Sequence, residues 1–122
     1  MNAWHEPELR DAFFGLIMYE ENQSQIPESF MMLYVKPHQY KPSLPRTELT
    51  QRYELCEDLA AMLVDTVSTQ QFQLGITEDD ALETCWRGLL NQPELVSEPE
   101  SFWVVCRLAE LLGWPLPASP WP

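Results

Sequence analysis

The sequence predicts an all-α fold, a compact bundle of four or five helices joined by proline-rich connections. Residues 47–75 carry apolar side chains at helical spacing, and two later segments begin with residues typical of helix starts. One short apolar run has no convincing second strand with which to pair. The 122 residues are expected to form a single helical domain over 1–122, long enough for a modest core.

The N-terminal segment is expected to start as an extended tail over 1–6 and to continue as a helix. Pro7 suits the first helical position, and the apolar residues after it return to one helix face. These residues are Leu9, Ala12, Phe13, Leu16 and Ile17. Phe14 and Met18 lie outside this stripe, so we expect either a second element or a partner protein to cover them.

Residues 30–35 form an apolar run that periodicity alone assigns neither to a helix nor to a strand. A helix opened by Pro27 is favoured, because a lone strand would leave its backbone polar groups unpaired. Residues 36–46 follow as a proline-rich basic loop of extended character. Its basic side chains are Lys36, His38, Lys41 and Arg46. In a chain this acidic, we expect the loop to lie over an acidic face of its own domain.

Residues 47–75 are expected to form the longest helix, with the rest of the chain packed around it. Their apolar positions recur at intervals of four and three, which returns them to one helix face. These positions are Leu49, Tyr53, Cys56, Ala60, Leu63 and Val67. Thr47 is predicted to cap the start, and Gly75 to end the helix in the left-handed conformation. The opposite face is expected to carry the acids Glu54, Glu57, Asp58 and Asp65.

A further helix is predicted from Thr77 to about Asn91. Thr77 and Asp80 resemble a capping box, and the acidic residues of this first turn suit the positive end of the helix dipole. The residues expected on its apolar face are Ala81, Leu82, Cys85, Trp86 and Leu89. Pro93 marks the break that follows.

The last helix has the strongest start signal in the chain. Ser97 and Glu100 have the spacing of a capping box, and a proline lies in the same turn. The helix is apolar nearly all round, so it is either central to the domain or shared with another molecule. Gly113 is expected to end it, and residues 115–122 to form an extended tail.

No pattern in the sequence predicts a catalytic, cofactor-binding or metal site, and we predict that the protein is not an enzyme. The two histidines, His5 and His38, have no obvious neighbour that would orient a general base. No glycine-rich segment suits a phosphate group, and no cysteine–histidine pair has zinc spacing. Cys56, Cys85 and Cys106 are expected to be buried free thiols.

The net charge of −12 limits the partners that the chain can bind. Like charge disfavours direct contact with nucleic acid or with an anionic membrane. A basic protein is the partner that this charge attracts, with an affinity that falls as salt rises. No apolar run approaches the roughly 20 residues of a membrane-spanning helix, and the N-terminus lacks the pattern of a secretory signal. The predicted location is the cytoplasm.

The leading functional hypothesis is a non-catalytic regulatory or inhibitory protein, of the anti-activator, immunity or anti-defence type, acting as a monomer or as a homodimer. It would bind a partner protein through apolar helix faces rimmed by acidic residues. The predicted partner-binding residues are Phe14, Met18, Trp103, Val104, Trp114 and Trp121. The alternative is an acidic nucleic-acid mimic that occupies a DNA-binding protein. An enzyme is the third hypothesis, for which a loss of function at His38 would be the first support.

Overall fold

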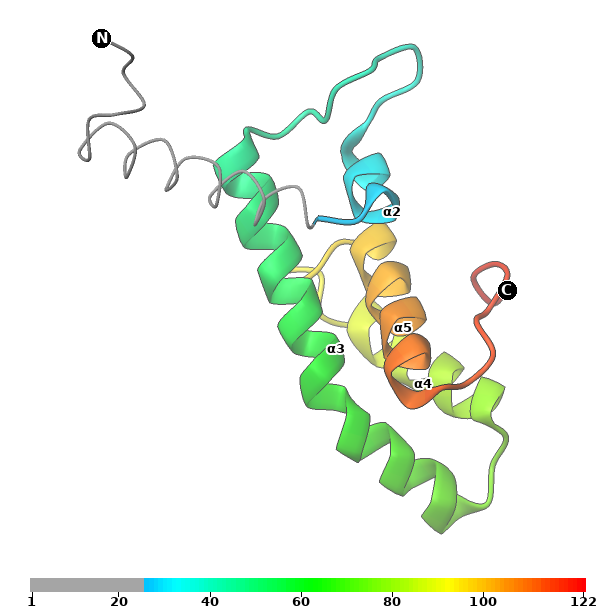
Figure 1. Cartoon of the computed structure of the whole chain (residues 1–122). Coiled ribbons are helices and arrows are strands. Elements are labelled where there is room, and N and C mark those ends of the chain that lie inside the picture. The colour runs from blue at the N-terminus through cyan, green and yellow to red at the C-terminus, as the bar shows by residue number, and fades with distance from the viewer. Residues whose placement is uncertain (1–25) are drawn as a thin grey trace, which may run out of the picture.

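Figure 1 shows the computed structural model of the chain, in which residues 26–122 are described. This part of the chain is all-helical and contains no strand, so the predicted all-α class is confirmed for it. The α-helices are α2 (Glu28–Met31), α3 (Arg46–Leu74), α4 (Glu78–Leu90) and α5 (Glu98–Leu112), and a 3₁₀ turn, η2 (Met32–Tyr34), follows α2. The helical prediction for the apolar run that starts at Phe30 is therefore correct as far as Tyr34.

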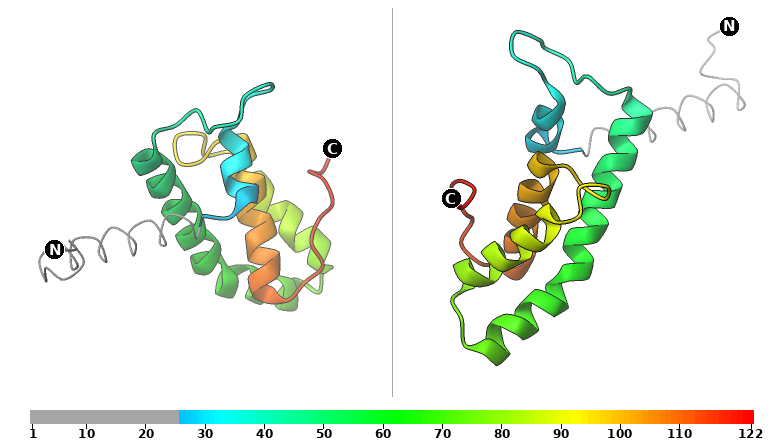
Figure 2. Two further views of the ribbon diagram at one scale, coloured as in Figure 1. Left: turned by 45° about the horizontal axis from the view of Figure 1, so that its top comes forward. Right: turned by 180° about the vertical axis from the view of Figure 1, so that it is seen from behind.

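The predicted tail over 1–6 and the predicted helix after Pro7, with Phe14 and Met18, lie outside the described residues. In the described part, no helix is both long enough and apolar enough to cross a bilayer. The proline-rich loop runs out from the end of the molecule at which α3 begins, as Figures 1 and 2 show. Its basic side chains are exposed, and none forms an ion pair with a described carboxylate. The expected contact between this loop and an acidic face is not found among these residues.

The start of α3 differs from the prediction. Pro45 precedes the first helical residue, Arg46, and Thr47 already lies inside the helix. The Thr47 hydroxyl therefore does not cap α3, and no side chain does. Because Pro45 holds the extended backbone that suits the residue before a helix, the helix begins two positions earlier than a Thr47 cap would allow. The predicted end is confirmed, since Gly75 adopts the left-handed conformation with φ 62°.

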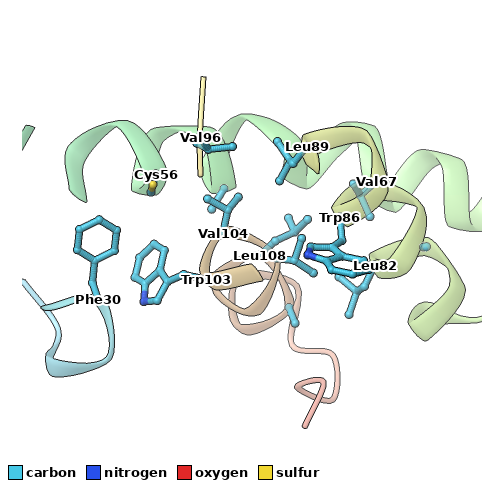
Figure 3. Packing of buried hydrophobic residues seen from close by; sticks show 14 of the residues in the cluster. Phe30, Cys56, Val67, Leu82, Trp86, Leu89, Val96, Trp103, Val104 and Leu108 are labelled. Carbon is cyan, nitrogen blue, oxygen red and sulfur yellow. The ribbon is translucent and has the colours of Figure 1, made fainter. Parts of the chain in front are cut away.

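The predicted apolar stripe of α3 is confirmed and faces the rest of the molecule. Its fully buried members are Leu49, Cys56, Ala60 and Val67, while Tyr53 and Leu63 are half-buried. Figure 3 shows Cys56 on the side of α3 that faces Val104 of α5, and Val67 beside Trp86 of α4. Glu57 was predicted on the opposite, solvent-facing side, but it reaches across to Arg107 of α5. The helical position of Glu57 is close enough to the buried stripe for this contact.

The central element is α5 rather than α3. It packs against α2, α3 and α4, which fits the first of the two alternatives left open for this helix, a position at the centre of the domain. Figures 1 and 2 show α3 along one side of α5, with α4 on another. A helix that is apolar nearly all round can be covered on several sides, whereas the single apolar stripe of α3 admits neighbours on one side only. Beyond α5, the C-terminal half of α3 carries an exposed Phe72 and Leu74.

The predicted capping box at the start of α5 is present, whereas α4 has only the half of it in which the Thr77 side chain acts as the cap. The Thr77 hydroxyl accepts the backbone N–H of Asp80 at 3.0 Å. The Ser97 hydroxyl accepts from the Glu100 N–H, while the Glu100 carboxylate accepts from the Ser97 N–H at 2.7 Å. At the other end of α5, Gly113 is left-handed, and the Trp114 N–H returns to the Ala109 carbonyl at 2.9 Å.

Candidate partner-binding groove

The solvent-facing side of α5 carries an apolar groove, to which Tyr53 of α3 and Trp86 of α4 also contribute. Two adjoining cavities of about 560 Å³ and about 360 Å³ share Leu33, Pro99 and Phe102 in their linings. We call this feature the α5 groove. From α5 it is lined by Phe102, Trp103, Cys106 and Glu110, and from the segment above by Ser29 and Leu33. Volumes of this size are typical of ligand-binding sites.

The spacing of residues along α5 creates the groove. Pro99, Trp103, Cys106 and Glu110 recur at intervals of four, three and four, so they follow one face of the helix. The opposite face carries Val104, Leu108 and the other fully buried core residues. The apolar character of α5 therefore serves two purposes, because one face builds the core and the other lines the groove.

A buried carboxylate holds the 3₁₀ turn against the start of α5. Glu100 is 2% exposed and accepts hydrogen bonds from Arg52 Nε at 2.8 Å and Arg52 Nη2 at 2.6 Å. It also accepts from the Ser97 N–H and from the Tyr34 hydroxyl. Because Tyr34 and Glu100 are the chain neighbours of Leu33 and Pro99, this network positions two residues that line both cavities.

The network also determines the protonation of its members. Burial alone would raise the pKa of Glu100, but the hydrogen bonds from Arg52, Ser97 and Tyr34 outweigh it and lower the pKa to about 2. Burial and the hydrogen bond to Glu100 raise the pKa of Tyr34. At neutral pH, Glu100 is therefore ionised and Tyr34 is a hydrogen-bond donor. The wall of the groove is therefore supported by the ion pair of Glu100 and Arg52, and the protonation of this pair does not change under physiological conditions.

The charge along the groove is acidic at both ends. Arg107 binds Glu57 through Nε at 3.0 Å and Nη2 at 2.9 Å, and its Nη1 binds Glu110 at 2.9 Å. Two carboxylates thus surround one guanidinium, and Glu110 stays half-exposed at the rim. Glu98 is exposed and lines the other end. An apolar floor with acidic ends suits an apolar segment that carries basic groups on its flanks.

The three cysteines are free thiols in this structure. Burial raises the pKa of Cys56 to about 12 and the pKa of Cys85 to about 11. Burial, with a contribution from Glu110, also raises the pKa of Cys106 to about 11. The thiol that lines the groove is therefore protonated at neutral pH, which makes it a weak nucleophile. His38 is exposed in the loop and has no hydrogen-bond partner among residues 26–122.

The structure separates the four predicted partner-binding residues that it describes into three groups. Trp103 is 8% exposed and forms one wall of the groove, where its Nε1 donates to Ser29 Oγ at 3.0 Å. Val104 is fully buried in the core, as Figure 3 shows, so it is not accessible to a partner here. Trp114 and Trp121 are half-buried against the core. Phe14 and Met18 lie outside the described residues.

Trp121 is held against the domain by its neighbours. Its ring centroid lies 5.5 Å from Trp86 and 6.3 Å from Phe102, and its Nε1 donates to Asp79 Oδ2 at 3.0 Å. The side chain of Arg87 donates to the Pro122 carbonyl at 2.8 Å. Residues 115–122 form no helix, as predicted, but they return to α4 and α5 and border one end of the groove.

Sequence reasoning missed several residues of the groove. Tyr53 was assigned to the apolar stripe of its helix, Leu33 to the apolar run 30–35 and Phe102 to a helix that is apolar nearly all round, and none of the three was assigned to a binding site. The signal that was available is the all-round apolar character of α5, which indicates a face left over after the core is built. Periodicity cannot identify that face, because the choice depends on where α3 and α4 pack.

Comparisons of the chain with protein-family models, with curated proteins and with solved structures found no match. Within residues 26–122, no three His, Cys, Asp or Glu side chains are grouped so that they could hold a metal ion. The function must therefore be inferred from the α5 groove and from the charge distribution around it.

Proposed function

We propose that this chain is a non-catalytic regulatory or inhibitory protein of the cytoplasm that binds a partner protein through the α5 groove. In this proposal, the whole chain forms one compact helical bundle with proline-rich connections. The observation that carries it is the apolar solvent-facing side of α5, where Phe102 and Trp103 line a cavity of about 560 Å³. Aromatic side chains at the centre of such a groove are the kind that dominate protein-binding energy.

The groove also suggests the chemistry of the partner. Glu98 and Glu110 are twelve positions apart on one helix, a separation of about 18 Å at the helical rise per residue. A partner segment with apolar anchors at helical spacing and a basic residue near each end would complement both the floor and the rims. Such a segment can come from another protein or, in a homodimer, from a second copy of this chain.

The charge distribution gives the alternative, a nucleic-acid mimic, less support. Mimicry requires a continuous stripe of carboxylates that copies the spacing of phosphates. The long exposed stretch of α3 and the turn after it, residues 59–77, contain one charged residue, Asp65. Among the other described carboxylates, one group lies at the start of α4, and another pairs with Arg52, Arg87 and Arg107. Glu48, Glu54 and Asp58 are exposed on the first half of α3, apart from both groups. We therefore favour a protein that binds its partner through the α5 groove over a nucleic-acid mimic.

A capture experiment with two phenylalanine variants tests the proposal. The tagged full-length protein, Phe102→Ala and Phe72→Ala are incubated with nuclease-treated lysate of the native host, and retained proteins are compared by quantitative mass spectrometry. Phe72 is 84% exposed on α3 and does not line the groove, so it is the matched control. We expect Phe102→Ala to weaken capture of one protein by about tenfold or more, and Phe72→Ala to leave it unchanged.

Salt separates the two functional hypotheses in the same experiment. Washing from about 0.1 M to about 1 M salt shortens the Debye length about threefold. A partner held mainly by the apolar floor should survive this wash in reduced amount. Loss of all capture at high salt, together with equal behaviour of the two phenylalanine variants, would contradict the groove and support mimicry instead.

A further inference from the structure

A second cavity lies at the base of the proline-rich loop, away from the α5 groove. Its volume is about 400 Å³, and it is lined by both the loop and the domain. Its apolar part consists of Ile26, Met31, Pro42, Leu44 and Leu49, of which Ile26 and Leu49 are buried. We call it the loop-base pocket. None of its lining residues lines the α5 groove, so the two sites are separate.

Two cations line this apolar pocket. Lys41 and Arg46 are both exposed, and neither is within ion-pair distance of a carboxylate among residues 26–122. The other described arginines each pair with at least one carboxylate: Arg52, Arg87 and Arg107. Two cations that have no ion pair with any carboxylate of residues 26–122 thus lie around one pocket, and they form a local site of opposite sign in a chain whose net charge is −12.

Folding stability does not account for the position of Arg46. It is the first residue of α3, and a cation near a helix N-terminus interacts unfavourably with the helix dipole. An acidic or neutral residue there would be better for the helix. The guanidinium is therefore better explained by what it can bind, since its planar donors match a carboxylate with two parallel hydrogen bonds.

We propose that the loop-base pocket binds a small amphipathic anion, a soluble carboxylate attached to a short apolar chain. Arg46 and Lys41 bind the carboxylate, and the apolar chain contacts Met31, Leu44 and Leu49. The volume of the pocket is within the range of small-molecule sites, and the pairing of an apolar floor with a few charged groups is typical of them. The site is independent of the proposed partner groove.

Titration of the full-length protein with octanoate tests the proposal. Binding is followed by isothermal calorimetry and by amide chemical shifts. We expect saturable binding with one octanoate per chain, and shifts centred on the residues of the pocket. Octanol has the same apolar chain without the charge, and we expect it to bind about tenfold more weakly or worse.

Charge variants within the same loop supply the control. The double variant Lys41→Gln/Arg46→Gln should weaken octanoate binding by about tenfold or more, because both carboxylate contacts are removed. Lys36→Gln removes a cation from the same loop that does not line the pocket, and it should change the affinity by less than about twofold. All three positions are exposed, so circular dichroism should show unchanged helix content in every variant.

Five outcomes would overturn the proposal. The first is no saturable binding at millimolar octanoate, and the second is equal binding of octanol. The third is a loss of octanoate affinity in Lys36→Gln as large as the loss in Lys41→Gln/Arg46→Gln, which would indicate that only the overall charge of the loop attracts the anion. The fourth is binding to phosphatidylglycerol vesicles without binding of free octanoate, which would indicate a lipid surface. Octanoate binding that appears only in Glu20→Gln/Glu21→Gln would also overturn it, since carboxylates of the chain itself would then fill the pocket.

Discussion

At the scale of single residues, Glu100 connects three parts of the fold. It is buried at the start of α5 and accepts hydrogen bonds from Arg52 of α3 and Tyr34 of the 3₁₀ turn. A buried carboxylate is costly unless it is paired and fully hydrogen-bonded. Here each carboxylate oxygen accepts two hydrogen bonds, because Ser97 N–H and Arg52 Nη2 bind Oε1 while Tyr34 and Arg52 Nε bind Oε2.

This network leads to a prediction about pH. The pKa of Glu100 is lowered from 4.5 to about 2, so the carboxylate stabilises the fold above pH 4.5 and loses this contribution as the pH falls toward 2. We expect Glu100→Gln to reduce the free energy of unfolding at pH 7 by about 3 kcal/mol. The difference between the two proteins should shrink as the pH is lowered below 4.5. Urea unfolding across this range measures it.

Glu110 is the control for that prediction. Its side chain is 52% exposed and pairs with Arg107 at the surface, so Glu110→Gln should change the free energy of unfolding by less than about 1 kcal/mol. The assigned role of the Glu100 charge would be contradicted if the free energies of unfolding of Glu100→Gln and the wild type differed by the same amount from pH 7 to pH 3.

At the scale of elements, the helix starts differ in a way that the sequence only partly shows. Thr77 and Ser97 cap α4 and α5 with their side chains, whereas Thr47 lies inside α3 and caps nothing. All three positions carry a hydroxyl residue with an acidic residue soon after it, so the local sequences look alike. The proline before Arg46 makes the difference, because it already has the extended backbone of a cap residue.

Alanine substitutions at these positions test the three assignments. Ser97→Ala and Thr77→Ala should each lower the free energy of unfolding by about 1 kcal/mol, since each leaves a helix N–H without its acceptor. Thr47→Ala should be neutral or slightly stabilising, because alanine has the higher helix propensity. Thermal unfolding of the three variants gives the comparison. A loss at Thr47 equal to the loss at Ser97 would show that α3 begins later than the structure places it.

At the scale of the whole molecule, the C-terminal tail closes the domain. Trp121 packs on Trp86 of α4 and on Phe102 of α5, so one side chain connects two helices. Its indole N–H also reaches Asp79 in the first turn of α4. Because Phe102 and Trp86 line the α5 groove, the tail supports one end of the proposed binding surface.

Removal of this contact should loosen the tail and reduce stability. We expect Trp121→Ala to lower the free energy of unfolding by about 2 kcal/mol, less than for a fully buried tryptophan, because Trp121 is half-buried. The tail should also become more sensitive to limited proteolysis. Leu116→Ala is the control, since Leu116 is 54% exposed in the same tail and should have little effect on either measurement. Equal effects of both variants would show that Trp121 does not anchor the tail.

Much of the described fold follows from local chemistry that the sequence displays. The stripe from Leu49 to Val67, the cap at Ser97 and the left-handed ends at Gly75 and Gly113 are all predicted and present. These features depend on residues within one or two helical turns of each other, so no knowledge of distant contacts is needed.

The candidate site depends on contacts between distant residues, and sequence reasoning located it only in part. Trp103 was predicted and lines the groove, but Phe102 and Leu33 were not identified. Glu100 was predicted as the acidic member of a capping box, yet it is also buried in an ion pair with Arg52, which lies 48 positions away in the chain. The periodicity of apolar residues cannot predict an ion pair between segments that are distant in the sequence.

The sequence by itself determined the helical class of the described residues, most of their helix boundaries and the strongly acidic charge, since these depend on composition and on neighbours along the chain. Tertiary structure alone decided that α5 is the central helix, that its two faces divide between core and groove, and that the basic loop extends from the domain. The physical reason is that an apolar side chain gains the same hydration free energy against any apolar neighbour. Which neighbour it meets is decided only when all the helices pack together.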